Sequence, residues 1–179
     1  MSKPNLVLLD CDIIIFCHQL GVWEQLKTSS NVAVASTVAH EARYFRSQHG
    51  NKSIDIGSQI TRKEIQCLEA TAAELAGAVR DFARVFVAAL QYGELEAIAL
   101  LISGRFEGWL FCTGDRIAMQ AVAMLGLSDR IISFEKLLTE TGLKGRITGR
   151  LNRAPSEETL QYHLDLGKTR RVTREYFIS

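Results

Sequence analysis

The sequence lacks the long apolar segments of membrane and secreted proteins. Its first apolar runs are short, since Leu6–Leu9 stops at Asp10 and Ile13–Cys17 stops at His18. A helix that crosses a bilayer needs about 20 apolar residues in a row. The N-terminal residues MSKPNLVLLD also lack the apolar core and the cleavage site of a signal peptide. We therefore expect a cytoplasmic protein with no membrane contact.

The sequence also has few cysteines, and none of them forms a C-x-x-C pair. No histidine lies beside them at the spacing of zinc ligands. We expect small, buried, reduced side chains and no structural disulfide. A P-loop, a G-x-G-x-x-G fingerprint and a credible Ser-His-Asp set are absent as well, which excludes the commonest nucleotide-binding and serine-hydrolase patterns. The four cysteines are Cys11, Cys17, Cys67 and Cys112.

The chain has little net charge, but the charge is unevenly distributed. Residues 1–141 contain 13 basic and 16 acidic residues, whereas residues 142–179 contain eight basic and four acidic ones. With 179 residues and 47% hydrophobic content, the chain has the size and composition of one globular domain. We predict a domain over 1–141 and a basic C-terminal extension over 142–179 that is not a separate domain. The extension is either a polyanion-facing edge, with Arg170 and Arg171 as weak candidates for RNA contacts, or a solvated or docked tail.

Short apolar runs alternate with helical patterns along the chain. This alternation predicts a single three-layer α/β/α domain with a mainly parallel sheet of four or five strands. Residues 48–58 have the composition of a loop, with a small hairpin around Ile54 and Ile56. The pattern at 61–90 is helical with a break near Arg84, after which 85–90 could instead be a strand. The other predicted strands are 5–9, 32–35, 109–112 and 130–133, and the other predicted helices are 13–20, one starting at Ser36 or Thr37, 94–103, 115–125, 134–141 and 156–166.

Two predicted strands end in acidic residues. The first strand delivers Asp10, with Asp12 two residues later, and the strand at 109–112 delivers Thr113 and Asp115. In a parallel α/β sheet, ligands bind beyond the carboxyl ends of the strands. These carboxylates are therefore candidates for chemistry, and Thr113 is a candidate for orienting Asp115 or contacting a substrate.

Two further acids interrupt apolar helices. Glu41 and Glu96 have Phe45 and Leu100 at the i+4 position, so neither has a basic partner there. Taken singly, each acid is more simply explained as a solvent-facing helix residue. Taken together, four carboxylates without basic partners cannot all stay ionised in one pocket unless cations neutralise them. Oxygen ligands suit Mg²⁺ or Mn²⁺, which can activate a water and stabilise a leaving oxygen at a phosphodiester.

The order apolar-strand-Asp, helix-Glu, GELEAIALL and LFCTGD resembles the PIN-domain nucleases over about residues 5–140, most closely the branch with a Gly-Glu-x-Glu-Ala-Ile-Ala-Leu helix. The resemblance implies a divalent-metal-dependent ribonuclease with Asp10, Glu41, Glu96 and Asp115 as its metal ligands. It also implies that the protein could be the toxin of a toxin–antitoxin pair, with an antitoxin partner and a homodimer. Asp12 stands where the family usually has Ser or Thr and is a further ligand candidate, and Glu94 is a rival for the role of Glu96.

Two other functions fit part of the pattern. Asp10 and Asp12 resemble the nucleophile and the acid/base of haloacid-dehalogenase-like phosphatases. That class needs a second acid four or five residues after Asp115, where this chain has Met119 and Gln120. It also needs a Lys ahead of that loop, and the sequence has none between residues 63 and 115. The remaining alternative is a non-catalytic PIN-like scaffold.

Overall fold

The computed structural model describes residues 6–47, 50–146 and 155–178. Its core is a four-stranded parallel sheet in the order β5-β2-β1-β6, which confirms the predicted α/β class and strand number. A separate antiparallel hairpin, β3–β4, lies outside this sheet. The strands are β1 (Leu6–Leu9), β2 (Asn31–Ala35), β3 (Tyr44–Ser47), β4 (Gly50–Ser53), β5 (Gln66–Leu68) and β6 (Trp109–Cys112).

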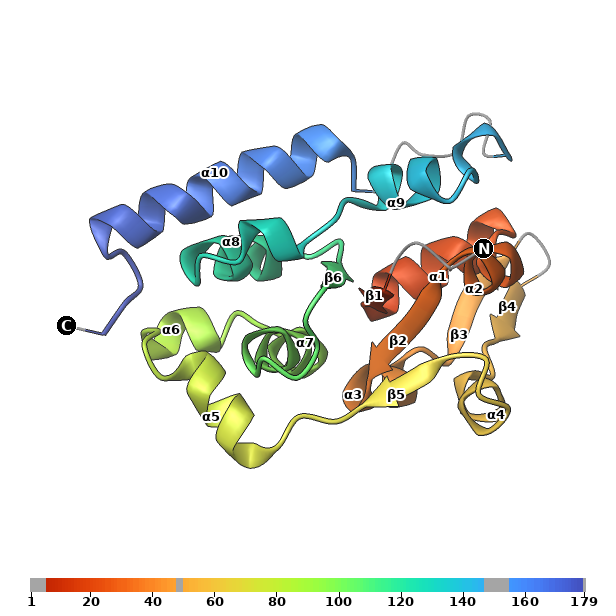
Figure 1. The fold of residues 1–179 in the computed structure, drawn as a ribbon, viewed down its shortest axis with the longest axis horizontal. Helices are drawn as coiled ribbons and strands as arrows, with labels where there is room; N and C mark the ends of the chain where they lie inside the picture. Colours follow the sequence, from red (N-terminus) through yellow and green to blue (C-terminus); the bar gives the residue numbers. More distant parts are fainter. Residues whose placement is uncertain (1–5, 48–49, 147–154, 179) are drawn as a thin grey trace.

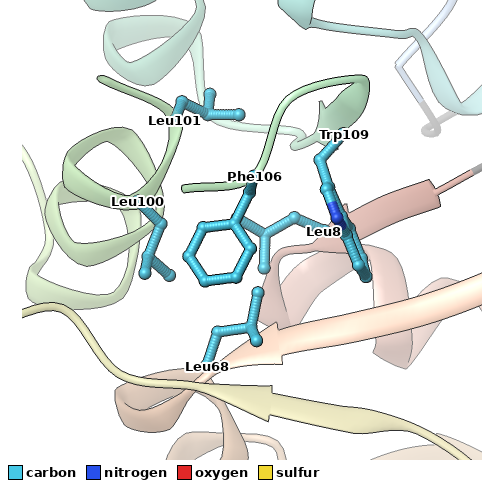
Figure 2. Close-up of a pocket in the computed structure, with 6 residues that line it drawn as sticks. All are labelled: Leu8, Leu68, Leu100, Leu101, Phe106 and Trp109. Atoms are coloured by element: carbon cyan, nitrogen blue, oxygen red, sulfur yellow. The ribbon is translucent and has the colours of Figure 1, made fainter. Parts of the chain in front are cut away.

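Helices cover the sheet, as Figure 1 shows. Residues that alternate along β1 point to opposite faces. On one face, Leu8 and Trp109 pack with α7 side chains around an apolar hollow that has no room for a water molecule (Figure 2). On the other face, buried Cys112 lies near Cys17 of α1. The helices are α1 (Cys11–Leu20), α2 (Trp23–Ser29), α3 (Ser36–Glu41), α4 (Ile56–Thr61), α5 (Ala72–Val79), α6 (Arg84–Val87), α7 (Tyr92–Ile102), α8 (Arg116–Met124), α9 (Phe134–Glu140) and α10 (Glu157–Thr173).

The middle of the chain differs from the prediction. The region 61–90 is not one interrupted helix, because β5 forms at its start and α5 and α6 follow, and the alternative strand at 85–90 is wrong. The hairpin spans residues 44–53, so it precedes buried Ile54 and Ile56 instead of including them. The predicted strand at 130–133 is reduced to one bridge between Phe111 and Ile131. Within the described ranges, no helix is both long enough and apolar enough to cross a bilayer.

The C-terminal helix packs along α8 (Figure 1). It runs to Thr173, seven residues beyond the predicted end, and it buries Leu160, His163 and Leu164. After it, the ring of Phe177 packs against that of Phe82 in a tilted arrangement, with ring centroids 5.5 Å apart. The described part of the predicted extension is therefore attached to the domain at both ends. Residues 147–154, with Arg150 and Arg153, lie outside the described residues.

Gly167 allows the close approach of α10 to α8. A Cβ atom at this position would lie 2.5 Å from the backbone oxygen of Gln120 and 2.7 Å from the Cβ of Ala123. We expect Gly167→Ala to destabilise the fold by about 1–3 kcal/mol, because the helices must move apart. Gly77 of α5 is the matched control, since a Cβ there meets nothing within 4 Å. Gly77→Ala should stabilise the fold by about 0.5–1 kcal/mol through helix propensity. Urea unfolding of both variants checks the pair, and equal effects would contradict this packing.

Candidate functional site

The carboxyl ends of the parallel strands bring acids together at one edge of the sheet. Asp10 follows β1 and is the N-cap of α1, where its Oδ1 accepts a hydrogen bond of 2.7 Å from the Cys11 backbone N–H. Asp115 lies three residues after β6 and is the N-cap of α8, where its Oδ1 accepts from Ala118 N–H at 2.7 Å. Both acids thus satisfy orphan N–H groups of a helix, which fixes each carboxylate at the strand–helix junction.

Thr113 links these two acids. Its hydroxyl donates to Asp10 Oδ2 at 2.8 Å and accepts from the Asp115 backbone N–H at 3.0 Å. Its side chain is buried, with 1% exposure. Thr113 is therefore placed to orient the Asp10 carboxylate and the backbone at Asp115. Contact of Thr113 with a substrate stays a prediction.

Asp12 and Glu41 lie at the border of this site and are exposed. The Cβ of Asp12 lies 3.9 Å from the position that a Cβ on Gly114 would take, so Asp12 is close to the turn after β6. The carboxylate of Glu41 is close to the start of α7, because its Oε2 lies 3.3 Å from the equivalent position on Gly93. The charges of both acids contribute to raising the pKa of the Cys11 thiol, after burial and Asp10. These contacts bring Asp12 and Glu41 to the same edge as Asp10.

The acid of α7 that faces Asp10 and Asp115 is Glu94. It is buried with 3% exposure, and its Oε2 accepts from the Gln91 backbone N–H at 2.8 Å. Burial, followed by the charge of Asp115, raises its pKa to about 8, and Asp10 and Asp12 contribute further. Glu94 is the N3 residue of a capping box with Gln91. This pattern could have identified Glu94 from the sequence, but only if the first residue of the helix were known.

Glu96 was the predicted ligand, and the structure gives it other partners. Its Oε1 accepts from the Ser36 hydroxyl at 2.9 Å and from Ala70 N–H at 3.2 Å, and its Oε2 accepts from Thr37 N–H at 2.8 Å. These donors follow the ends of β2 and β5. Glu96 therefore joins two strand ends and the first turn of α3, and it is not grouped with the other acids.

The basic candidates lie beside α8 and the turn that follows it. Arg170 donates to the side-chain oxygen of Gln120 and stacks over Tyr176 at 4.9 Å. The guanidinium of Arg171 lies against Gly126, just beyond the C-terminal end of α8, whereas Asp115 caps the other end. A helix rises by about 1.5 Å per residue, so the length of α8 separates the two positions. Arg171 thus lies away from the acidic edge, whereas Arg170 contacts Gln120 in the middle of α8. Both side chains have intramolecular contacts, and their RNA contacts stay a prediction.

The electrostatics of the site are those of repelling carboxylates. Burial raises the pKa of Asp10 to about 6, against the hydrogen bonds from Thr113 and Cys11, and Asp12 and Asp115 raise it further. Among the residues that the structure describes, no salt bridge joins Asp10, Asp12, Glu94 or Asp115 to a basic side chain. This donor set consists of carboxylate oxygens, the ligands that Mg²⁺ and Mn²⁺ prefer.

The donor chemistry fits a hard cation, but the side chains are not arranged as a finished site. In the ranges 6–47, 50–146 and 155–178, no three His, Cys, Asp or Glu side chains form a group that could hold an ion as they stand. The carboxylates would have to turn toward one another to share one.

The comparisons of the sequence with known proteins identified no relative. The sequence matches no protein-family model and no curated protein at a significant level.

Proposed function

We propose that this protein is a divalent-metal-dependent ribonuclease that hydrolyses phosphodiester bonds at the acidic edge of its sheet. The observation that carries the proposal is the gathering of Asp10, Glu94 and Asp115 at one edge of the sheet. The charge of Asp115 raises the pKa values of Asp10 and Glu94, and within the described residues no salt bridge to a basic side chain offsets it. Carboxylates without basic partners destabilise one another by repulsion, and a bound cation neutralises that repulsion. The PIN-like order of acids along the sequence supports the choice of reaction and of RNA.

Each acid has a distinct part in this proposal. Asp10, Glu94 and Asp115 would hold Mg²⁺ or Mn²⁺, with Asp12 and Glu41 as outer candidates. When bound, the metal would activate a water and stabilise the leaving oxygen. Thr113 donates a 2.8 Å hydrogen bond to one oxygen of the Asp10 carboxylate, which limits the orientations open to this ligand. No side chain needs to act as a nucleophile in this scheme, and a phosphatase of the haloacid-dehalogenase type would leave buried Glu94 without a role.

Replacing Asp10 tests the reaction directly. We expect Asp10→Asn to lower Mn²⁺-dependent cleavage of a labelled single-stranded RNA at least 100-fold, because a neutral amide is a poor metal ligand. Asn retains one oxygen that can accept from Cys11 N–H, and the Thr113 hydroxyl can rotate to accept from the new NH₂ group, so the melting temperature should change little. Gel analysis of the RNA and a thermal melt measure the two effects. A folded Asp10→Asn protein with wild-type, metal-dependent activity would refute the proposal.

A further inference from the structure

The β3–β4 hairpin begins three residues after Glu41 and has two different faces. Tyr44 pairs with Ser53 and Arg46 pairs with Asn51, so these four side chains share one face. Phe45 is on the opposite face and stacks on His18 of α1 at 5.2 Å. The first face is therefore free of the contact that attaches the hairpin to the domain.

The attachment of the hairpin is well defined at its base. The Arg43 carbonyl accepts from Ile54 N–H at 2.7 Å, and Ile54 is buried. His18, which stacks on Phe45, also stacks on Trp23 at 5.2 Å. Phe45 and Ile54 thus account for the folding of the hairpin without any contribution from its outer face.

The outer face carries features that the fold does not use. Tyr44 is 62% exposed, and Arg46, Asn51 and Ser53 are exposed as well. Between Glu41 and Asp55 the sequence has three basic residues and no acid. Of these, Arg46 lies on the outer face, whereas Lys52 pairs with Phe45 on the other face. Within the described residues, Arg46 forms no salt bridge. An exposed aromatic ring beside an arginine without a salt bridge suits a strand of nucleic acid, whose bases stack on the ring and whose phosphates pair with the cation.

We propose that this outer face binds the single-stranded RNA that leads away from the acidic edge. Tyr44 stacks on an unpaired base, Arg46 contacts a phosphate about 7 Å further along the strand, and Asn51 and Ser53 donate to the backbone. The proposal rests on the proposed function for the identity of the ligand. It also supplies positive charge on the side of Glu41, which the C-terminal arginines do not.

Binding of a fluorescein-labelled, 20-nucleotide single-stranded RNA, followed by anisotropy in EDTA, tests this surface without cleavage. We expect Tyr44→Ala to weaken binding about tenfold and Tyr44→Phe to retain it, because stacking needs the ring and not the hydroxyl. Arg46→Ala should reduce the slope of log K against log salt by about 0.7, the loss of one phosphate contact. Tyr162→Ala and Lys168→Ala on α10 are matched controls, since both side chains are exposed, and they should leave binding unchanged.

The outcomes separate this proposal from the ribonuclease proposal. Wild-type affinity in Tyr44→Ala, or equal weakening in Tyr162→Ala, would overturn the RNA-binding face even if the protein cleaves RNA. If the wild type binds RNA through Tyr44 but does not cleave it with Mn²⁺, the hairpin proposal is supported and the hydrolysis proposal fails. Thermal melts of all variants show whether each is folded, and the exposed positions of Tyr44 and Arg46 predict unchanged melting temperatures.

Discussion

Glu94→Gln should stabilise the metal-free protein at pH 8 and remove Mn²⁺-dependent cleavage. Glu94 has a pKa of about 8 in the fold, raised first by burial and then by Asp115. An unfolded Glu loses its proton near pH 4.3. The folded state therefore binds more protons between about pH 4 and pH 8, and its stability falls as the pH rises through this window. The neutral Gln removes that penalty and keeps an oxygen for the Gln91 N–H.

The expected size of this effect is large for one substitution. The penalty at pH 8 is on the order of 3 kcal/mol, so the melting temperature of Glu94→Gln should exceed that of the wild type by about 6 °C or more. At pH 4 the two proteins should melt at nearly the same temperature. Cleavage should fall at least 100-fold, because a ligand is lost. A variant that is less stable than the wild type at pH 8 and still active would contradict this placement of Glu94.

Glu96→Gln should have the opposite effect on stability. The Glu96 carboxylate accepts from the Ser36 hydroxyl and from the N–H groups of Thr37 and Ala70. Gln replaces one acceptor oxygen with a donor, which leaves buried donors facing an NH₂ group. Hydrogen bonds to a charged group are worth about 1.5–3 kcal/mol each, so we expect a loss of about 3 kcal/mol and a melting temperature lower by about 10 °C.

The two variants lie two residues apart in one helix, and each is the control of the other. Folded Glu96→Gln should retain metal-dependent cleavage per folded molecule when it is assayed well below its melting temperature. If Glu96→Gln were stable and inactive while Glu94→Gln were active, the roles of the two acids would be reversed, as the sequence pattern had suggested.

The sequence predicted three of the four strands of the sheet and the places of Asp10 and Asp115 beyond the ends of two of them. Short apolar runs that end in polar residues identified β1, β2 and β6, and therefore Asp10 and Asp115, because strand ends define the edge where side chains meet. The strand β5 was missed because it has only three residues, Gln66–Leu68, within a region of helical composition. Tertiary pairing with β2 decides its conformation, and local propensity cannot reveal this.

The choice between Glu94 and Glu96 depended on the rotational position of α7. Side chains two positions apart in a helix point in directions about 200° apart around its axis. Only one of the two acids can therefore face Asp10. The helix begins at Tyr92, two residues before the predicted start, which makes Glu94 the N3 residue. The sequence shows both acids, but it does not show at which residue the helix begins.

The C-terminal region shows a similar limit. The predicted helix stopped at Leu166, directly before Gly167, a residue type that commonly follows the end of a helix. Here Gly167 continues α10 since it permits contact with α8. The excess of basic residues in 142–179 indicated either a polyanion-facing surface or a solvated or docked tail, and a count of charges does not show where the side chains lie. Arg171 lies beside Gly126, at the end of α8 that is remote from Asp115, and Arg170 contacts Gln120 in the middle of α8.

Titration of Mn²⁺ into the metal-free protein by calorimetry, at pH 7 in two buffers of different ionisation enthalpy, tests the central claim most directly. Glu94 is mostly protonated at pH 7 because its pKa is about 8, so a metal that it binds must displace that proton. We predict binding with release of about one proton in the wild type, and weaker binding without that release in Glu94→Gln. No binding at millimolar Mn²⁺, or the same proton release from both proteins, would contradict a metal site built on Asp10, Glu94 and Asp115.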